Sequence, residues 1–124
     1  MLTLKPTNDP ALIKDLCEKN GLQFSKNIKA FIAENNGICG YSLYYIKSNF
    51  VLIEIVDVFG DTALFDGIIR AVLNSAFLNG INIAKFENSV DEKLLYKFNF
   101  ITKSDNKINS IEAFLSGCKK DSTF

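Results

Sequence analysis

Histidine and tryptophan are both missing from this sequence of 124 residues. Without histidine, the chain has no histidine-based catalytic triad, no histidine metal ligand and no histidine general base. The three cysteines, Cys17, Cys39 and Cys118, lack the spacing of a metal site and cannot all pair with one another. We therefore predict no metal centre, reduced thiols and a cytoplasmic location.

An excess of charge and a long hydrophobic run are missing as well. The 14 basic and 14 acidic residues give a net charge of zero, and no basic tract is present, so we predict no binding to nucleic acid. The apolar run 50–58 is too short to span a bilayer and contains Glu54 and Asp57. Residues 1–6 do not have the pattern of a signal peptide, and we predict no membrane partner.

Apolar residues, by contrast, are abundant. Hydrophobic residues make up 48% of the chain and 11 residues are phenylalanine, which is enough to build a buried core in a single domain. We expect this domain to cover residues 1–118, followed by a polar tail at 119–124.

Residues 50–58 have the pattern of a buried strand. They are almost continuously apolar and rich in β-branched side chains, which is typical of a central strand covered on both faces. Two acids, Glu54 and Asp57, interrupt the run. Because side chains alternate along a strand, their spacing of three predicts that they lie on opposite faces.

A helix and a second strand are predicted to follow. Residues 63–79 have the apolar spacing of an amphipathic helix, with Asp61 or Thr62 as its cap and Gly80 at its end. A second apolar strand follows at 81–86. In two parallel strands joined by a helix, the helix begins at the carboxyl end of the first strand, where anions bind readily.

The remaining pattern predicts an α+β fold with a mixed, mostly antiparallel sheet flanked by helices. Asn35-Asn36-Gly37 lies between two strand-like runs and is a hairpin turn, because its turn positions need a positive φ. Pro6 is expected to stop the first strand, and residues 104–107 to form a turn. The predicted strands are 2–5, 30–34, 38–45, 50–58, 81–86 and 100–102, and the predicted helices are 10–20, 63–79, 91–97 and 110–118.

Four passages, in this order, resemble the GNAT acetyltransferase superfamily. They are residues 31–41, residues 56–58, the helix that ends at 79–81, and residues 94–100, and the match of order and local pattern extends over nearly the whole chain. The resemblance implies the acyl-CoA N-acyltransferase fold. It also implies transfer of an acetyl group from acetyl-CoA to an amine.

The resemblance further implies where coenzyme A or acetyl-CoA would bind. In this family the backbone amides of a glycine-rich loop hold the pyrophosphate. The matching candidate cofactor-binding residues are Val58, Gly60, Asp61, Thr62, Ala63, Leu64, Phe65 and Asn88. The loop departs from the family pattern, because Ala63 and Phe65 replace its glycines, and Asp61 and Asp66 bring negative charge.

Three residues are candidates for the chemistry. Tyr96 matches a tyrosine that protonates the departing thiolate in many members of the family. Glu54 and Asp57 are candidate bases, because burial raises the pKa of a carboxyl group toward neutrality. Each candidate also has a structural interpretation: Tyr96 as a helix residue with its ring in the core, the two acids as carboxylates paired with neighbouring donors, and Asn88 as a helix cap.

Two functions remain open from the sequence. The first is a GNAT-type N-acetyltransferase that acts on an unknown small-molecule amine or peptide. The alternative is a GNAT-like fold without catalysis that serves as a binding or interaction module. Tyr41, Tyr44 and Tyr45 on one predicted strand suggest a ligand groove or a homodimer interface, although core packing explains them as well.

Overall fold

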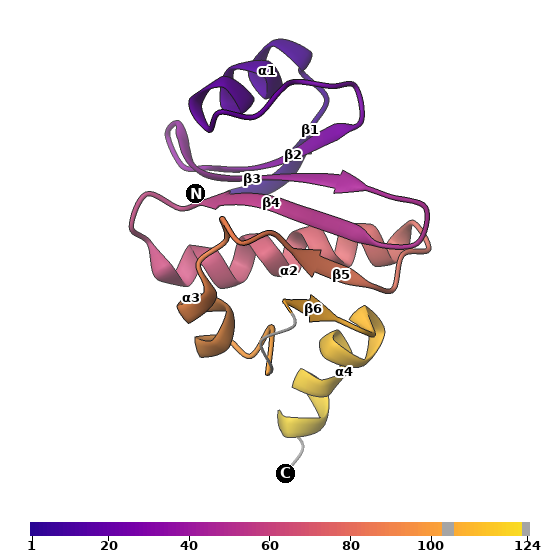
Figure 1. Ribbon diagram of the computed structural model, residues 1–124. Coiled ribbons are helices and arrows are strands. Elements are labelled where there is room, and N and C mark those ends of the chain that lie inside the picture. The colour runs from indigo at the N-terminus through magenta and orange to yellow at the C-terminus, as the bar shows by residue number, and fades with distance from the viewer. Residues whose placement is uncertain (103–105, 123–124) are drawn as a thin grey trace.

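The computed structural model describes residues 1–102 and 106–122, with only the backbone for 117–122. Strands and helices follow one another in the predicted order (Figure 1). They are β1 (Thr3–Thr7), α1 (Pro10–Lys19), β2 (Ile28–Glu34), β3 (Ile38–Ile46), β4 (Val51–Asp57), α2 (Thr62–Leu78), β5 (Ala84–Phe86), α3 (Glu92–Lys97), β6 (Lys107–Ile108) and α4 (Ile111–Ser122).

The six strands form one sheet in the order β1-β2-β3-β4-β5-β6. Only the β4–β5 pair is parallel, and the other neighbours are antiparallel. This confirms the predicted mixed, mostly antiparallel sheet. The β2–β3 turn confirms the predicted hairpin, since Asn36 has φ 59° and Gly37 has φ 125°.

Helices cover the two faces of the sheet unequally. On one face α1 packs on β2 and β3, where Leu16 and Cys17 meet Ile32 and Leu43. On the other face α2 crosses the sheet, with α3 and α4 beside it (Figure 1). No described helix is long and apolar enough to cross a membrane.

The parallel unit around α2 confirms the central expectation from the sequence. Asp61 is the N-cap of α2, and Gly80, with φ 87°, follows its C-terminus. The predicted burial of β4 on both faces is wrong for its second half. Val51 and Ile53 are buried under α2, but Leu52 and residues 54–57 are only half-buried.

Two local predictions are also wrong. Pro6 lies inside β1, where the edge position leaves its missing N–H without consequence. Residues 100–102 do not form a strand. Phe100 and Ile101 are buried by core packing alone, and β6 forms at 107–108 instead.

Part of the C-terminal prediction lies outside the described residues. This applies to positions 104 and 105 of the predicted 104–107 turn and to the side chain of Cys118. The helix α4 extends to Ser122, beyond the expected start of the polar tail at 119. The boundary between domain and tail stays a prediction.

Gly40 on β3 permits close packing between the sheet and the first turn of α2. A Cβ atom at Gly40 would lie 2.8 Å from Leu64 Cδ2 and 3.2 Å from the backbone oxygen of Asp57. At Gly67, inside α2, a Cβ atom would meet only Leu4 Cδ1, at 3.8 Å. The two glycines therefore differ in what a methyl group would displace.

We expect Gly40→Ala to destabilise the protein by about 1 to 3 kcal/mol, because Leu64 and the end of β4 must move apart. Gly67→Ala should stabilise it by about 0.5 to 1 kcal/mol, because alanine favours a helix interior. Urea unfolding measures the free energy of unfolding of both variants. Equal effects of the two substitutions would contradict this account of Gly40.

Candidate functional site

A β-bulge in β4 decides where the two candidate bases lie. Leu43 pairs with Ile55 while its neighbour Tyr44 pairs with Ile53, so Glu54 is an extra residue in β4. The bulge shifts the alternation and puts Glu54 on the same face as Asp57. The predicted placement on opposite faces is therefore wrong.

Beyond the bulge, β4 and β5 separate. Their pairing ends where Phe86 lies beside Ile53 and the N–H of Glu87 donates to the oxygen of Ile53 at 2.9 Å. Past this point β4 continues to Asp57 without β5, and the hydroxyl of Ser89 donates to the backbone oxygen of Glu54. The opening between the strands thus begins at Glu54, and Ser89 lies at its start.

Glu54 is the most strongly perturbed carboxylate of this region. Partial burial raises its pKa, the negative charge of Glu87 raises it further, and Lys47 lowers it. Its charge also acts on Tyr45, which lies on the same face as Asp57 and Tyr41. A carboxylate whose pKa is raised is a stronger proton acceptor than an ordinary carboxylate.

Asp57 is tied to its neighbours by hydrogen bonds. One carboxylate oxygen accepts from the N–H of Phe59 at 3.1 Å, and the other accepts from the hydroxyl of Tyr41 at 3.4 Å. Asn20 donates to the same hydroxyl at 2.9 Å. Burial raises the pKa of Tyr41. These contacts favour the structural interpretation of Asp57, which fixes the loop before α2.

The loop from Val58 to Asp61 brings backbone N–H groups to the start of α2. Phe59 and Gly60 have positive φ values of 52° and 89°, and the exposed ring of Phe59 lies edge-on to Tyr41. Asp61 Oδ1 accepts from the N–H of Leu64 at 3.3 Å. A positive φ at a phenylalanine is a strained conformation of the kind found at ligand-binding loops.

The loop residues divide into a buried and an exposed group. Val58, Leu64 and Phe65 point into the core, where the ring of Phe65 stacks on Phe98 at 6.3 Å. Leu64 and Phe65 could therefore contact a cofactor only through their backbone. Gly60, Thr62 and Ala63 are exposed, and their N–H groups donate no hydrogen bond to another group in the described parts of the chain.

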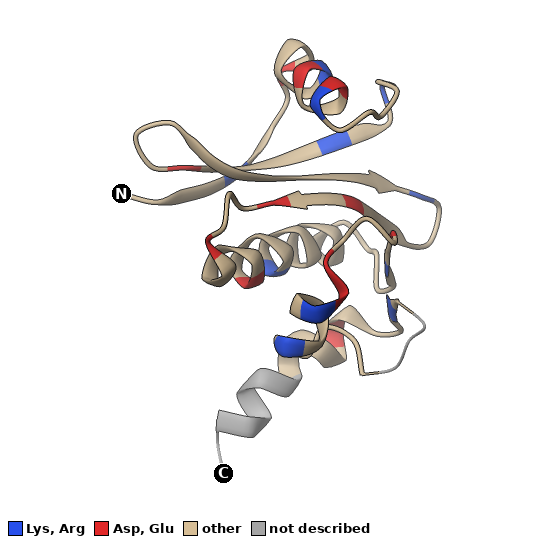
Figure 2. Cartoon of the chain, turned by 60° about the vertical axis from the view of Figure 1, so that its left-hand side comes forward, with Lys and Arg blue, Asp and Glu red and all other residues tan. Residues whose placement is uncertain are grey.

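This donor set fits the pyrophosphate of coenzyme A, because free N–H groups at a helix start are suited to anionic oxygens. The surrounding charge opposes it. Acidic residues mark the end of β4, the start of α2 and the segment after β5 (Figure 2). Asp61 must also share its cap position with any bound anion. The backbone donors fit such a group, and the acidic side chains around them oppose it.

Two candidates lie on elements that follow β5. Tyr96 is 39% exposed on α3, which lies next to the start of α2 (Figure 1). Asn88 is not the cap of α3, since Asp91 takes that position. Instead its Oδ1 accepts from Asn106 Nδ2 at 3.2 Å, and it borders a polar cavity of about 450 Å³ with Lys85.

Sequence reasoning missed several neighbours of these candidates. The sequence pattern gives Ser89 no role at the site and includes Tyr41 only among three tyrosines of one strand. A second cavity, of about 620 Å³, lies between α1 and the start of β3, lined by Tyr41, Phe59, Asp15 and Glu18 among others. In the sequence, the spacing of three residues between Asp15 and Glu18 was the signal that both acids lie on one face of a helix. Within the described residues, no group of three or more acidic or cysteine side chains could hold a metal ion.

Glu54 gives a pH-dependent prediction. Because its pKa is raised in the folded protein above the ordinary value of 4.5, ionisation of Glu54 costs stability, and this cost grows as the pH rises through the folded pKa. We expect Glu54→Gln to raise the Tm at pH 7 and the gain to vanish near about pH 4. Asp15→Asn on α1 is the matched control. A gain that does not change with pH would refute the electrostatic cause.

Comparisons with known proteins fit this geometry. The sequence matches no family model and has no significant match among curated proteins. Solved structures do match. An Exiguobacterium protein described as a candidate acetyltransferase has a TM-score of 0.62 at 14% identity, over 94% of this chain and 98% of the other.

Two further structures agree. The ribosomal-protein-alanine N-acetyltransferase of Brucella melitensis has a TM-score of 0.60 at 10% identity, over 84% of this chain and 93% of its own. The candidate N-acetyltransferase YhhK of E. coli, bound to coenzyme A, has a TM-score of 0.56 at 12% identity, over 86% and 96%. The chain therefore has the fold of the GNAT N-acetyltransferases.

Proposed function

We propose that the chain is a small N-acyltransferase that uses acetyl-CoA to acetylate an amine. One observation carries the proposal: β4 and β5, joined by α2, separate beyond Ile53, with Glu54 at the opening. The loop 58–61 joins the end of β4 to α2, and the free N–H groups lie in this loop and in the first turn of the helix. An acyl carrier and an amine would meet at this opening.

Coenzyme A would be held by backbone donors. The N–H groups of Gly60, Thr62 and Ala63 are the available ligands for its pyrophosphate. When bound, the cofactor supplies an acetyl group activated as a thioester. Coenzyme A in the matched E. coli structure supports this assignment by analogy of fold.

Side chains of this protein would accept and donate the protons of the reaction. An amine is cationic in water and must lose a proton before it can attack a carbonyl carbon. Glu54, with its raised pKa, is the proposed acceptor of that proton. Tyr96, exposed on α3, is the proposed donor to the thiolate that leaves. Asp57 is proposed to hold the loop through Phe59 and Tyr41 rather than to act as a base.

The acceptor remains a small-molecule amine or a peptide amine. The negative charges of Glu54 and Glu87, which act on each other, favour a cationic acceptor over an anionic one. The same charges reduce the expected affinity for coenzyme A.

A second function is favoured by the loop. The carboxylates of Asp57 and Asp61 accept hydrogen bonds from the N–H groups of Phe59 and Leu64, where an anion would otherwise bind. A chain that satisfies its own anion-binding loop would serve as a binding or interaction module without catalysis.

Charge removal at the loop separates the two functions. Asp61→Asn keeps a residue type that caps helices well but removes the negative charge. We expect this variant to bind coenzyme A about 5- to 10-fold more tightly than the wild type, because one repulsion is worth on the order of 1 kcal/mol. Isothermal titration measures the affinity for coenzyme A of the wild type and of Asp61→Asn, with Asp15→Asn as the control. If neither protein binds coenzyme A at millimolar concentration, the transferase proposal fails.

Turnover tests the residues of the site. With acetyl-CoA and a panel of primary amines, release of free thiol should be detected for the wild type. The rate should fall about 100-fold in Glu54→Gln, within the usual range for a general base, and less in Tyr96→Phe. Turnover by the wild type would exclude the non-catalytic alternative. Unchanged rates in both variants would remove their assigned roles.

A further inference from the structure

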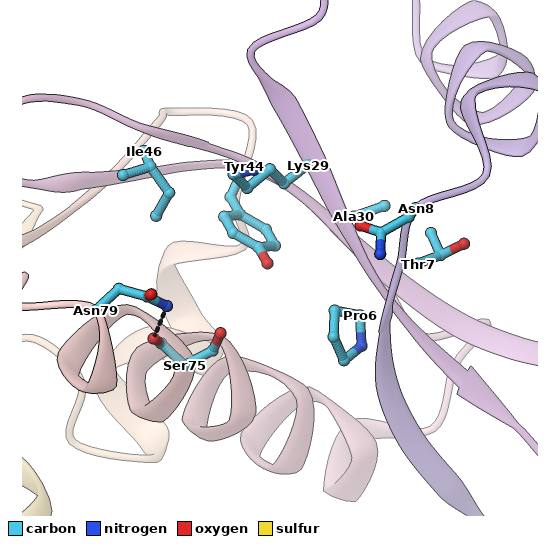
Figure 3. A pocket seen from close by; sticks show the side chains of 9 residues that line it. All are labelled: Pro6, Thr7, Asn8, Lys29, Ala30, Tyr44, Ile46, Ser75 and Asn79. Carbon is cyan, nitrogen blue, oxygen red and sulfur yellow. Dashed lines mark hydrogen bonds between the residues drawn. The ribbon is translucent and has the colours of Figure 1, made fainter.

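A cavity of about 330 Å³ lies at the far end of α2 from the proposed transferase site. It is lined by the end of β1, the start of β2, the end of β3 and the last turn of α2 (Figure 3). The 17 residues of α2 span about 25 Å, so a molecule bound here would not overlap the opening between β4 and β5. Its volume is in the range of small-molecule sites.

Tyr44 is the distinctive residue of this cavity. Its side chain is only 3% exposed, and Figure 3 shows its hydroxyl directed into the cavity between β3 and α2. Among the described residues, no group forms a hydrogen bond with this hydroxyl. Burial raises the pKa of Tyr44 to about 12. The hydroxyl is thus a protonated, unused donor at every physiological pH.

The other polar groups of the cavity also favour an anionic oxygen. Lys29 lies beside Tyr44 in the sheet, because the two residues pair across β2 and β3. Asn8 extends its amide toward the cavity, as Figure 3 shows. Pro6 and Ile46 supply an apolar wall. In the part of the chain that the structure describes, no acidic side chain lines the cavity.

A second, smaller cavity continues the first. Its volume is about 220 Å³, and it shares Thr7, Asn8 and Lys29 with the first cavity. It adds the cation of Lys26 and the partly exposed ring of Phe24, and again no acidic side chain lines it. The two cavities together offer two lysines and an extended apolar surface.

Two nearby negative features could oppose an anion, but both are engaged. The carboxylate of Asp9 accepts the N–H groups of Ala11 and Leu12 as the cap of α1. The last carbonyls of α2 are also used. The oxygen of Ser75 accepts from Asn79 Nδ2 at 2.8 Å, and that of Ala76 accepts from the N–H groups of Asn79 and Ile81.

We propose that this cavity binds a small organic carboxylate. The carboxylate oxygens accept hydrogen bonds from the Tyr44 hydroxyl and from Lys29, because a buried donor without a partner gains most from a charged acceptor. The apolar part of the molecule lies against Pro6 and Ile46. The site stands apart from the proposed acetyl transfer and does not depend on it.

Titration followed by ¹⁵N NMR tests the proposal on the intact chain. Hexanoate is the probe, and hexylamine and 1-hexanol are controls with the same apolar chain and a different head group. We expect hexanoate to shift the amide signals around residues 7, 29, 44 and 79, with saturation below about 20 mM. Hexylamine and hexanol should shift them at least about 10-fold less at the same concentration.

Single substitutions test which side chains contact hexanoate. Tyr44→Phe removes only the hydroxyl and should weaken hexanoate binding about 10-fold or more. Lys29→Gln should weaken it about 3-fold. Tyr45→Phe, on the opposite face of β3, should leave the affinity unchanged. A melting curve for each variant verifies that it is folded.

Three results would overturn the proposal. They are the absence of shifts at these residues, equal binding of hexylamine and hexanoate, and an affinity that Tyr44→Phe does not change. Inorganic phosphate is the remaining arm of the titration. If it bound more tightly than hexanoate, the site would be a phosphate site and the assignment to a carboxylate would fall.

Discussion

The packing of α2 on β4 is the constraint on which the rest of the structure depends. Val51 and Ile53 are buried under this helix, and the crossover from β4 to β5 makes the only parallel pair of the sheet. Because β5 is only three residues long, the two strands can stay together only to Ile53. The pairing therefore ends before Glu54, and β4 continues to Asp57 without β5 beside it.

The same corner carries two opposing electrostatic tendencies. The free N–H groups at the start of α2 attract anions, whereas Asp57 and Asp61 repel them and use neighbouring N–H groups for themselves. A helix needs a cap whether or not a ligand is bound, so a carboxylate cap contributes to folding in the same place where it weakens anion binding. The fold and the proposed binding of coenzyme A therefore place different demands on Asp61.

Much of the fold could be predicted from local signals. The cap of α2 and the β2–β3 turn were predicted well because Asp61 and Asn36-Gly37 each satisfy a backbone requirement within a few residues. The bulge at Glu54 was missed because it arises from pairing with β3, which sequence spacing does not encode. The hydrogen bond from Tyr41 to Asp57 was missed for the same reason, because it also arises from the pairing of β3 with β4. Phe100 and Ile101 have strand-like side chains, but core packing rather than pairing accounts for their burial.

The two outer borders of the sheet have a consequence for self-association. One border is β1, which contains Pro6 and the charged Lys5, and the other is β6, only two residues long. Neither offers a run of open backbone groups long enough to template another strand. Two copies of the chain could not readily pair their sheets edge to edge. Any pairing of protomers would have to rely on side-chain contacts between helices or sheet faces.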